Sequence, residues 1–160
     1  MNGVPIVMSQ FSPPPVRAHF VQRRQLNMKL REISKYPVTL VYAGAGYGKS
    51  TALSLYSRSE ENVCWYSISK NDDDFLPFFT KVVNAIRQLH PSFANSIEKQ
   101  IDSYDGFISP EHIFSLAARF INEAVALKKT IVLVLDDFHH VQSVNEIKQW
   151  MLFLLEHLPG

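Results

Sequence analysis

The chain has 160 residues and a mass of 18.3 kDa, enough for one domain but not comfortably for two. Its 16 basic and 15 acidic residues leave a net charge of +1, which gives no electrostatic argument for binding nucleic acid or an anionic membrane. The single cysteine, Cys64, excludes an intramolecular disulfide, and apolar runs as short as Ile131–Leu135 cannot span a bilayer. We therefore expect a globular protein of the cytoplasm that has no contact with membranes.

The proline run Pro13–Pro15 favours extended backbone, so residues 1–22 are interpreted as an extended lead-in. The remaining residues, 23–160, show no internal repeat and no tract of low complexity. We therefore predict one folded domain over residues 23–160.

The first elements of this domain are predicted by spacing and by breakers. Apolar residues at helical spacing predict a short amphipathic helix over Arg24–Lys35, which Pro37 ends. Val38–Tyr42 is β-branched and apolar and is followed by a glycine cluster, which predicts a buried parallel strand. A helix over Thr51–Ser59 is expected to follow.

Further along, strands and helices keep alternating. Val63–Ile68 and Ile131–Leu135 are predicted strands, and Asn71–Asp74 is a predicted turn that caps the next helix. A capping box formed by Ser143 and Glu146 predicts the start of the last helix. Helical spacing and capping residues predict four helices in this part: Phe75–His90, Phe93–Ile101, Ser109 to about Leu127, and Ser143 to about His157. The alternation predicts an α/β fold with a mostly parallel sheet.

The strongest chemical signal is the segment Ala43–Ser50, which reads AGAGYGKS and lies directly between a predicted strand and a predicted helix. A polyphosphate needs many hydrogen-bond donors around it with no side chain in the way. Glycines allow successive backbone N–H groups to point inward, and the start of the helix adds the positive end of its dipole. We therefore predict a phosphate-binding loop whose backbone contacts come from Gly44, Ala45, Gly46, Tyr47 and Gly48.

Three side chains at the start of the following helix complete this predicted site. Lys49 can reach the β- and γ-phosphates, the Ser50 hydroxyl can bind Mg²⁺, and Thr51 can bond the α-phosphate. The strict loop pattern has glycine where this chain has Ala43, which is tolerable if that residue only ends the strand with ordinary dihedral angles. A glycine-rich turn with an incidental lysine is the alternative interpretation.

A second signal is the apolar run Ile131–Leu135, which ends in two acids, Asp136 and Asp137. A buried parallel strand places its terminal carboxylate at the edge of the sheet where the phosphate loop also opens. Asp136 would hold Mg²⁺ through water, and Asp137 would orient or deprotonate the attacking water. Lys49 and Asp137 are therefore the predicted catalytic residues, and a solvated turn is the alternative interpretation of the two acids.

The order and identity of these motifs resemble the amino-terminal ATPase domain of MalT-like regulators, LuxR-type members of the STAND class of signalling ATPases. The most specific matches are Ala45–Lys49, which reads AGYGK, and Asp136–His139, which reads DDFH. The resemblance extends from about Pro13 to the end of the chain. Ser69 and Lys70 depart from the acidic pattern that follows the second strand in that family.

The resemblance implies a three-layer P-loop NTPase sandwich that binds ATP or ADP with Mg²⁺ and acts as a nucleotide switch. ADP would hold the protein closed, ATP and an inducer would open it to self-associate, and hydrolysis would reset it. The stretch Phe20–Arg24 would lie over the adenine, with Val21 against the base and Arg23 among the binding residues. A simple lead-in to the first helix is the alternative interpretation of that stretch.

The resemblance also implies that the sheet is incomplete. In this class a further strand, next in sequence, lies between the phosphate-loop strand and the strand that carries Asp136, and the chain stops at Gly160, where that strand would begin. We therefore expect either a gap in the sheet or closure of the two outer strands, with weak ATP hydrolysis. DNA binding would belong only to a carboxyl-terminal domain of a longer parent.

Two other functional classes share this loop. A small-molecule P-loop kinase is one, although such enzymes carry arginines in a late lid and Arg119 is the last arginine here. An interaction module that binds nucleotide without turnover is the other. The neighbouring His139 and His140 lack a third ligand at useful spacing, so we expect His139 to brace the acidic turn rather than to bind a metal.

Overall fold

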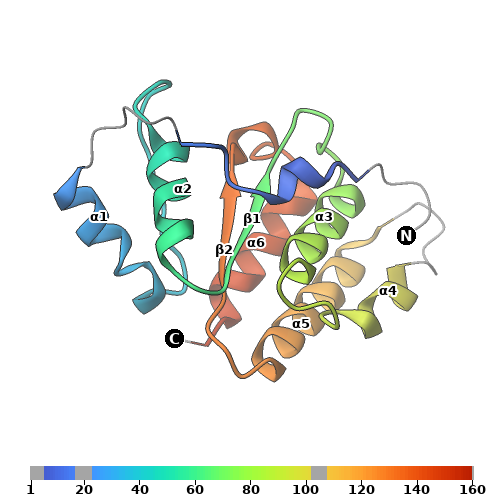
Figure 1. Cartoon of the computed structure of the whole chain (residues 1–160). Helices are drawn as coiled ribbons and strands as arrows, with labels where there is room; N and C mark the ends of the chain where they lie inside the picture. Colours follow the sequence, from blue (N-terminus) through green and yellow to red (C-terminus); the bar gives the residue numbers. More distant parts are fainter. Residues whose placement is uncertain (1–5, 17–22, 102–107, 160) are drawn as a thin grey trace.

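The computed structural model describes residues 6–16, 23–101 and 108–159, in which six α-helices accompany a two-stranded parallel sheet (Figure 1). Their order along the chain is α1 (Arg24–Leu30), α2 (Lys49–Ser59), β1 (Val63–Ser67), α3 (Phe75–Arg87), α4 (Asn95–Ile101), α5 (Pro110–Ala126), β2 (Val132–Asp136) and α6 (Asn145–His157). Short 3-10 turns lie at η1 (Met8–Phe11), η2 (Ile33–Lys35) and η3 (Phe138–His140). The fold is therefore mixed α/β, as the alternation of elements predicts.

The sheet carries helices on both faces because its strands alternate their side chains. The register runs from Val63 opposite Val132 to Ser67 opposite Asp136. On one face, Cys64 and Tyr66 belong to the large apolar core that α3, α5 and α6 supply, and the partly buried Leu133 and Leu135 pack against that core. On the other face, Val63 and Val132 pack against a smaller cluster of Leu30, Ala52 and Tyr56 from α1 and α2.

Aromatic rings fill the larger core. Phe79 of α3 and Phe120 of α5 both meet Trp150 of α6 edge to face, with ring centroids 5.7 and 5.3 Å apart. Trp150 and Phe79 are fully buried. These contacts fasten α3, α5 and α6 together behind the sheet and give β1 and β2 a rigid backing.

Strand β2 pairs with β1 on one side only among the described residues. The N–H of Val132 donates to Asn62 and the carbonyl of Asp136 accepts from Ile68, so these residues direct their backbone groups toward β1. In a parallel strand, the N–H and C=O groups of successive residues point alternately to one side and to the other. Those of Leu133 and Leu135 therefore point away from β1. The outer edge of β2 is therefore open to a further strand.

The prediction of a buried strand over Val38–Tyr42 is wrong. Leu40 is 89% exposed, Tyr42 is 99% exposed, and no described strand pairs with the segment. A run of β-branched and apolar residues becomes a strand only when a neighbour supplies backbone partners, and β2 does not pair with this segment. A wider P-loop sandwich would need more strands than β1 and β2 supply.

Two boundaries also differ from the expectation. The helix expected over Arg24–Lys35 is interrupted after α1 and resumes as the short turn η2. The predicted capping box of Ser143 and Glu146 does not form, because the N–H of Val144 bonds to Val141 in a turn and α6 starts at Asn145 without a side-chain cap. The predicted caps at Asp74 and Ser109 are confirmed.

The described part of the amino-terminal lead-in is folded against the domain. It contains η1, and Phe11 is only 6% exposed, with its ring 6.2 Å from that of Tyr66 in β1. In Figure 1 this segment crosses from the upper end of α2 to the end of β1. We call residues 7–14 the strap.

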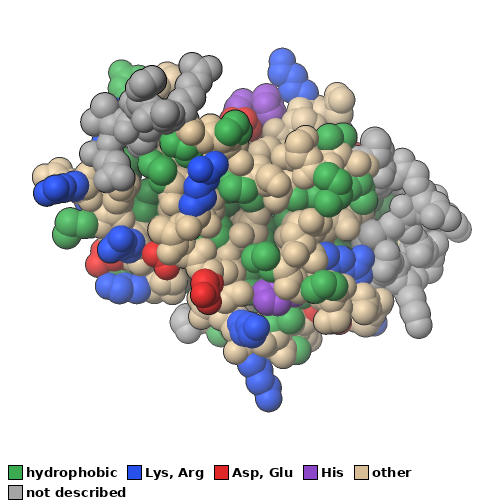
Figure 2. All heavy atoms as spheres, in the orientation of Figure 1, with side chains coloured by type: hydrophobic (Ala, Val, Ile, Leu, Met, Phe, Trp, Pro, Cys, Tyr) green, Lys and Arg blue, Asp and Glu red, His purple; other side chains and the backbone are tan. Residues whose placement is uncertain are grey.

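The surface shows no concentration of charge on the face drawn in Figure 2. There the Lys and Arg side chains of the described residues are dispersed, and those over α1 stand beside acidic ones. This dispersal agrees with the net charge of +1. Among the described helices, none combines the length and hydrophobicity that crossing a membrane requires.

Candidate functional site

The predicted phosphate-binding loop is an open turn that leads into α2. Gly46 and Gly48 have φ angles of 79° and 80°, in the left-handed region that glycine adopts without strain. Gly48 is also the N-cap of α2 and offers no side chain to the first N–H groups of the helix. Those donors, together with the positive end of the helix dipole, are available to an anion.

Lys49 is the first residue of α2, directly after this turn, and its ammonium group is hydrogen-bonded to carbonyl groups of the loop. Its Nζ donates to the carbonyl oxygens of Ala43 at 2.7 Å and Gly44 at 3.0 Å. The ring of Tyr47 packs so closely over Gly44 that a Cβ at that position would lie 3.1 Å from a ring carbon. The lysine is thus poised beside the loop, and a phosphate would have to replace carbonyl oxygens as its acceptors.

The hydroxyl of Ser50 joins this loop to the end of β2. Ser50 Oγ donates to Asp136 Oδ1 at 2.9 Å, across 86 positions of sequence. The same oxygen accepts the N–H of Asp137 at 3.1 Å. Asp136 is only 8% exposed, and this burial, with the nearby charge of Asp137, raises the pKa of its carboxyl despite the bond from Ser50.

Asp137 takes a left-handed backbone conformation, with φ at 58°, which turns the chain sharply after β2. Its side chain is about half exposed, and Oδ1 lies 3.7 Å from Nδ1 of His139. The ring of His139 lies 4.0 Å from that of His140. The carboxylate of Asp137 therefore faces solvent beside the loop, and His139 stands next to it as expected.

A hydroxyl and a buried carboxylate that converge beside a glycine-rich turn fit Mg²⁺, which prefers hard oxygen ligands and keeps several waters. No group of three or more His, Cys, Asp or Glu side chains in the described part of the chain could hold a metal alone. Ser50 and Asp136 therefore suit an ion that also takes oxygens from a phosphate and from water.

The remaining predicted site residues divide into two groups. Thr51 lies in the first turn of α2, as expected for a residue beside the loop. Arg23 is exposed at the start of α1, and no side-chain hydrogen bond of the described residues brings it to the loop. Val21 lies outside the described residues. The structure therefore brings together the loop, Ser50 and the two acids, and Arg23 does not join them.

The sequence analysis did not predict one buried polar network, which lies just after the carboxyl end of β1. Asp72 and Lys81 form an ion pair at 2.5 Å, with 0% and 6% of their side chains exposed. The backbone N–H and the hydroxyl of Ser69 also donate to Asp72. The position of Lys81 among the mostly apolar residues of α3 could have indicated a buried charge. It could not have identified Asp72 as its partner.

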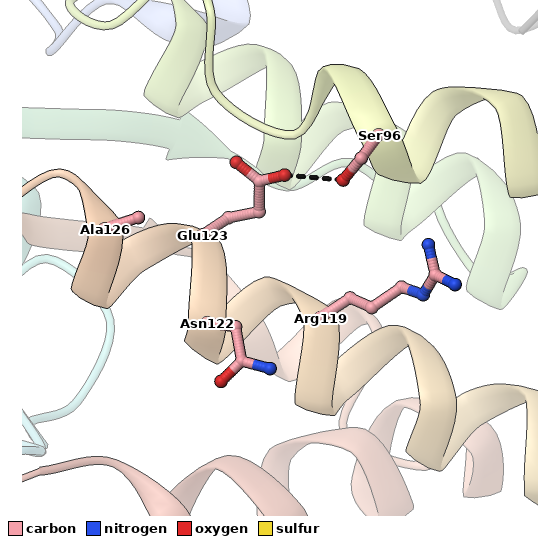
Figure 3. A pocket seen from close by; sticks show the side chains of 5 residues that line it. All are labelled: Ser96, Arg119, Asn122, Glu123 and Ala126. Carbon is pink, nitrogen blue, oxygen red and sulfur yellow. Dashed lines mark hydrogen bonds between the residues drawn. The ribbon is translucent and has the colours of Figure 1, made fainter.

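Two hollows in the surface lie away from the loop. One, of about 320 Å³, is lined by Gln25, Met28, Lys29 and Glu32 of α1 and the turn after it. The other, of about 280 Å³, lies between α4 and α5, where Ser96 donates to Glu123 at 2.5 Å and Arg119 extends along the opening (Figure 3). The residues that line both hollows are mostly polar, but neither hollow lies at a glycine-rich turn or at the end of a strand, so the predicted phosphate-binding loop remains the candidate site.

Sequence comparison relates the chain to known regulators. It is 30% identical over 154 residues to the HTH-type transcriptional regulator MalT of Cronobacter sakazakii and 29% identical over 158 residues to that of Yersinia enterocolitica. Each alignment covers 96% of this chain and 16% of the relative. The chain is therefore homologous to the amino-terminal region of these regulators and spans about 16% of their length. No protein-family model matches it.

Proposed function

We propose that this chain, a homologue of the amino-terminal region of MalT regulators, is a nucleotide switch that binds ATP and ADP with Mg²⁺ through residues 43–51. The observation that supports this most directly is the 2.9 Å bond between Ser50 and Asp136. It joins the first turn of a helix behind a glycine-rich loop to the acidic end of a strand, which is the arrangement a magnesium–phosphate site requires.

The chemistry would begin with the loop. The N–H groups around Gly46 and Gly48 and the start of α2 bind the phosphates, and Lys49 turns from the carbonyls of Ala43 and Gly44 toward them. The Ser50 hydroxyl oxygen and, through water, the Asp136 carboxylate would hold Mg²⁺, and the hydroxyl hydrogen can still bond to Asp136. Mg²⁺, when bound, would neutralise phosphate charge.

Hydrolysis would depend on Asp137. Its exposed carboxylate stands next to Asp136, where it can accept a hydrogen bond from a water aligned on the terminal phosphate. We expect slow turnover by this chain alone, because no described arginine lies at the site to stabilise the transition state. A nucleotide-binding module without turnover is the second candidate, favoured by the 52% exposure of the Asp137 side chain, which no described hydrogen bond holds in place.

The wider role is proposed by analogy with the relatives. They are transcriptional regulators, and this chain corresponds to about 16% of their length. We propose that DNA is bound only by a carboxyl-terminal domain of a longer parent, that the ATP state favours self-association of that parent, and that the protein works in the cytoplasm.

Titration of the folded chain with MgATP and MgADP, followed by calorimetry, tests the nucleotide binding on which the whole proposal rests. No heat of binding at millimolar nucleotide would contradict it.

Asp137→Asn is expected to reduce ATP hydrolysis at least about 100-fold while leaving MgADP affinity within twofold of the parent. Asparagine tolerates the left-handed backbone at this position, so the turn is kept and only the charge is lost. Phosphate release over hours, measured beside nucleotide titration, provides the check. Hydrolysis at the parent rate would remove Asp137 from the mechanism.

Asp136→Asn is expected to abolish the gain in nucleotide affinity that Mg²⁺ gives, yet to leave the free protein as stable as the parent or slightly more stable. Burial raises the pKa of Asp136, so its negative charge opposes folding at neutral pH, whereas an amide oxygen still accepts from Ser50 and Asp137. Urea unfolding, with nucleotide titration in Mg²⁺ and in EDTA, measures both effects. A loss of stability larger than about 1 kcal/mol would contradict this account of the buried carboxyl.

A further inference from the structure

The strap connects the end of β1 with α2. The candidate site lies between α2 and the end of β2, which is the strand paired with β1. The strap runs from the end of β1 and the start of α3, where η1 is seated, to the side of α2 (Figure 1). Both ends of the strap are held by partly buried hydrogen bonds, although the sequence suggested only an extended lead-in.

The first end is anchored to the end of β1. Gln10 Nε2 donates to the carbonyl oxygen of Ser67 at 3.3 Å and to Asp72 Oδ2 at 3.5 Å. Phe11 is buried in the core beside Tyr66. Ser67 is paired in the sheet with Asp136, so this anchor is one strand away from the carboxylate of the candidate site.

The second end is anchored to α2. Ser54 Oγ donates to the carbonyl oxygen of Pro14 at 2.6 Å, and Ser54 is fully buried. Ser54 lies four residues after Ser50, so the two hydroxyls share one face of the helix. Apart from the bonds of Lys49 to its own loop, the bonds of Ser50 to Asp136 and of Ser54 to Pro14 are the two side-chain hydrogen bonds among the described residues that join α2 to the rest of the chain.

We propose that the strap positions the phosphate loop relative to Asp136, with Ser54 and Gln10 as its positioning residues. This inference rests on the proposed function, because Ser50 and Asp136 would hold Mg²⁺ together only if α2 keeps its place against β2. The bond between Ser54 and Pro14 fixes α2 to the strap, and Gln10 fixes the strap to β1, the strand that pairs with β2. The strap therefore keeps the Ser50 hydroxyl within reach of Asp136.

The test compares nucleotide binding by the parent chain with that of Ser54→Ala, in Mg²⁺ and in EDTA. We expect Ser54→Ala to weaken MgATP and MgADP binding about five- to tenfold and to change binding in EDTA by less than twofold. Gln10→Ala, which removes the two hydrogen bonds at the other end of the strap without touching α2, is expected to act in the same direction. Ser57→Ala is the matched control, because its hydroxyl bonds only to the carbonyl of Ser54 within the same helix.

The outcomes separate this inference from the proposed function. A parent chain that binds no nucleotide contradicts the proposed function. A parent that binds, with Ser54→Ala and Gln10→Ala equal to it in Mg²⁺ even if they melt at lower temperature, contradicts the positioning role. Equal losses in Mg²⁺ and in EDTA also contradict it, because they indicate general damage to the loop. Should Ser54→Ala not fold, Gln10→Ala alone decides the question.

Discussion

Lys49→Ala is expected to weaken the binding of MgATP by roughly 30- to 150-fold, the loss that follows from removing a charged hydrogen-bond donor from a phosphate. The free protein should keep its stability, because the Nζ of Lys49 bonds only to two carbonyls of its own loop. Calorimetric titration with MgATP and MgADP measures the first effect, and urea unfolding measures the second.

Lys148→Ala is the matched control for this experiment. Lys148 is exposed in the first turns of α6 and its side chain has no described hydrogen bond, so its removal should change neither quantity. If Lys49→Ala bound nucleotide as tightly as Lys148→Ala, the loop would be an ordinary glycine-rich turn. The proposed function would then lose its basis.

Asp72→Ala is expected to destabilise the fold by about 3–5 kcal/mol, because it leaves the ammonium group of Lys81 buried without a counter-charge. Two donors from Ser69 lose their acceptor as well. Urea unfolding at neutral pH measures the loss. Asp73→Ala is the matched control, since Asp73 is the exposed neighbour and its removal should cost less than about 0.5 kcal/mol.

The pH dependence of that difference gives an independent check. Burial alone would raise the pKa of Asp72, but hydrogen bonds from Lys81 and Ser69 outweigh it and hold the pKa below its usual value of 3.8. A carboxyl with a lowered pKa stabilises the fold above its ordinary pKa and ceases to do so as the pH falls through the lowered one. The difference between parent and Asp72→Ala should stay constant from pH 8 to about 5 and shrink in stronger acid. A difference that grew in acid would contradict the ion pair.

Local signals sufficed for most elements and for the centre of the candidate site. Helical spacing located α3 and α5, and the apolar run before Asp136 located β2. The approach of Ser50 to Asp136 was expected from the pairing of the two motifs, although the strand before the loop, on which that expectation rested, does not form.

The main misses have a common physical cause, because each depended on a partner that no local spacing rule identifies. Val38–Tyr42 has the composition of a strand, but strand formation also needs a neighbour with free backbone groups. The pair of Asp72 and Lys81 and the bond from Ser54 to Pro14 join residues whose spacing follows no local period. Only the assembled fold reveals such contacts.

The open side of β2 has a practical consequence for anyone who concentrates this protein. The peptide groups of Leu133 and Leu135 have no sheet partner in the described part of the chain, so an extended polypeptide nearby can pair with them. With an isoelectric point near 7.9, molecules repel one another only weakly at neutral pH. Intermolecular sheet growth, rather than unfolding, should therefore set the solubility limit, and buffers well below the isoelectric point should raise it.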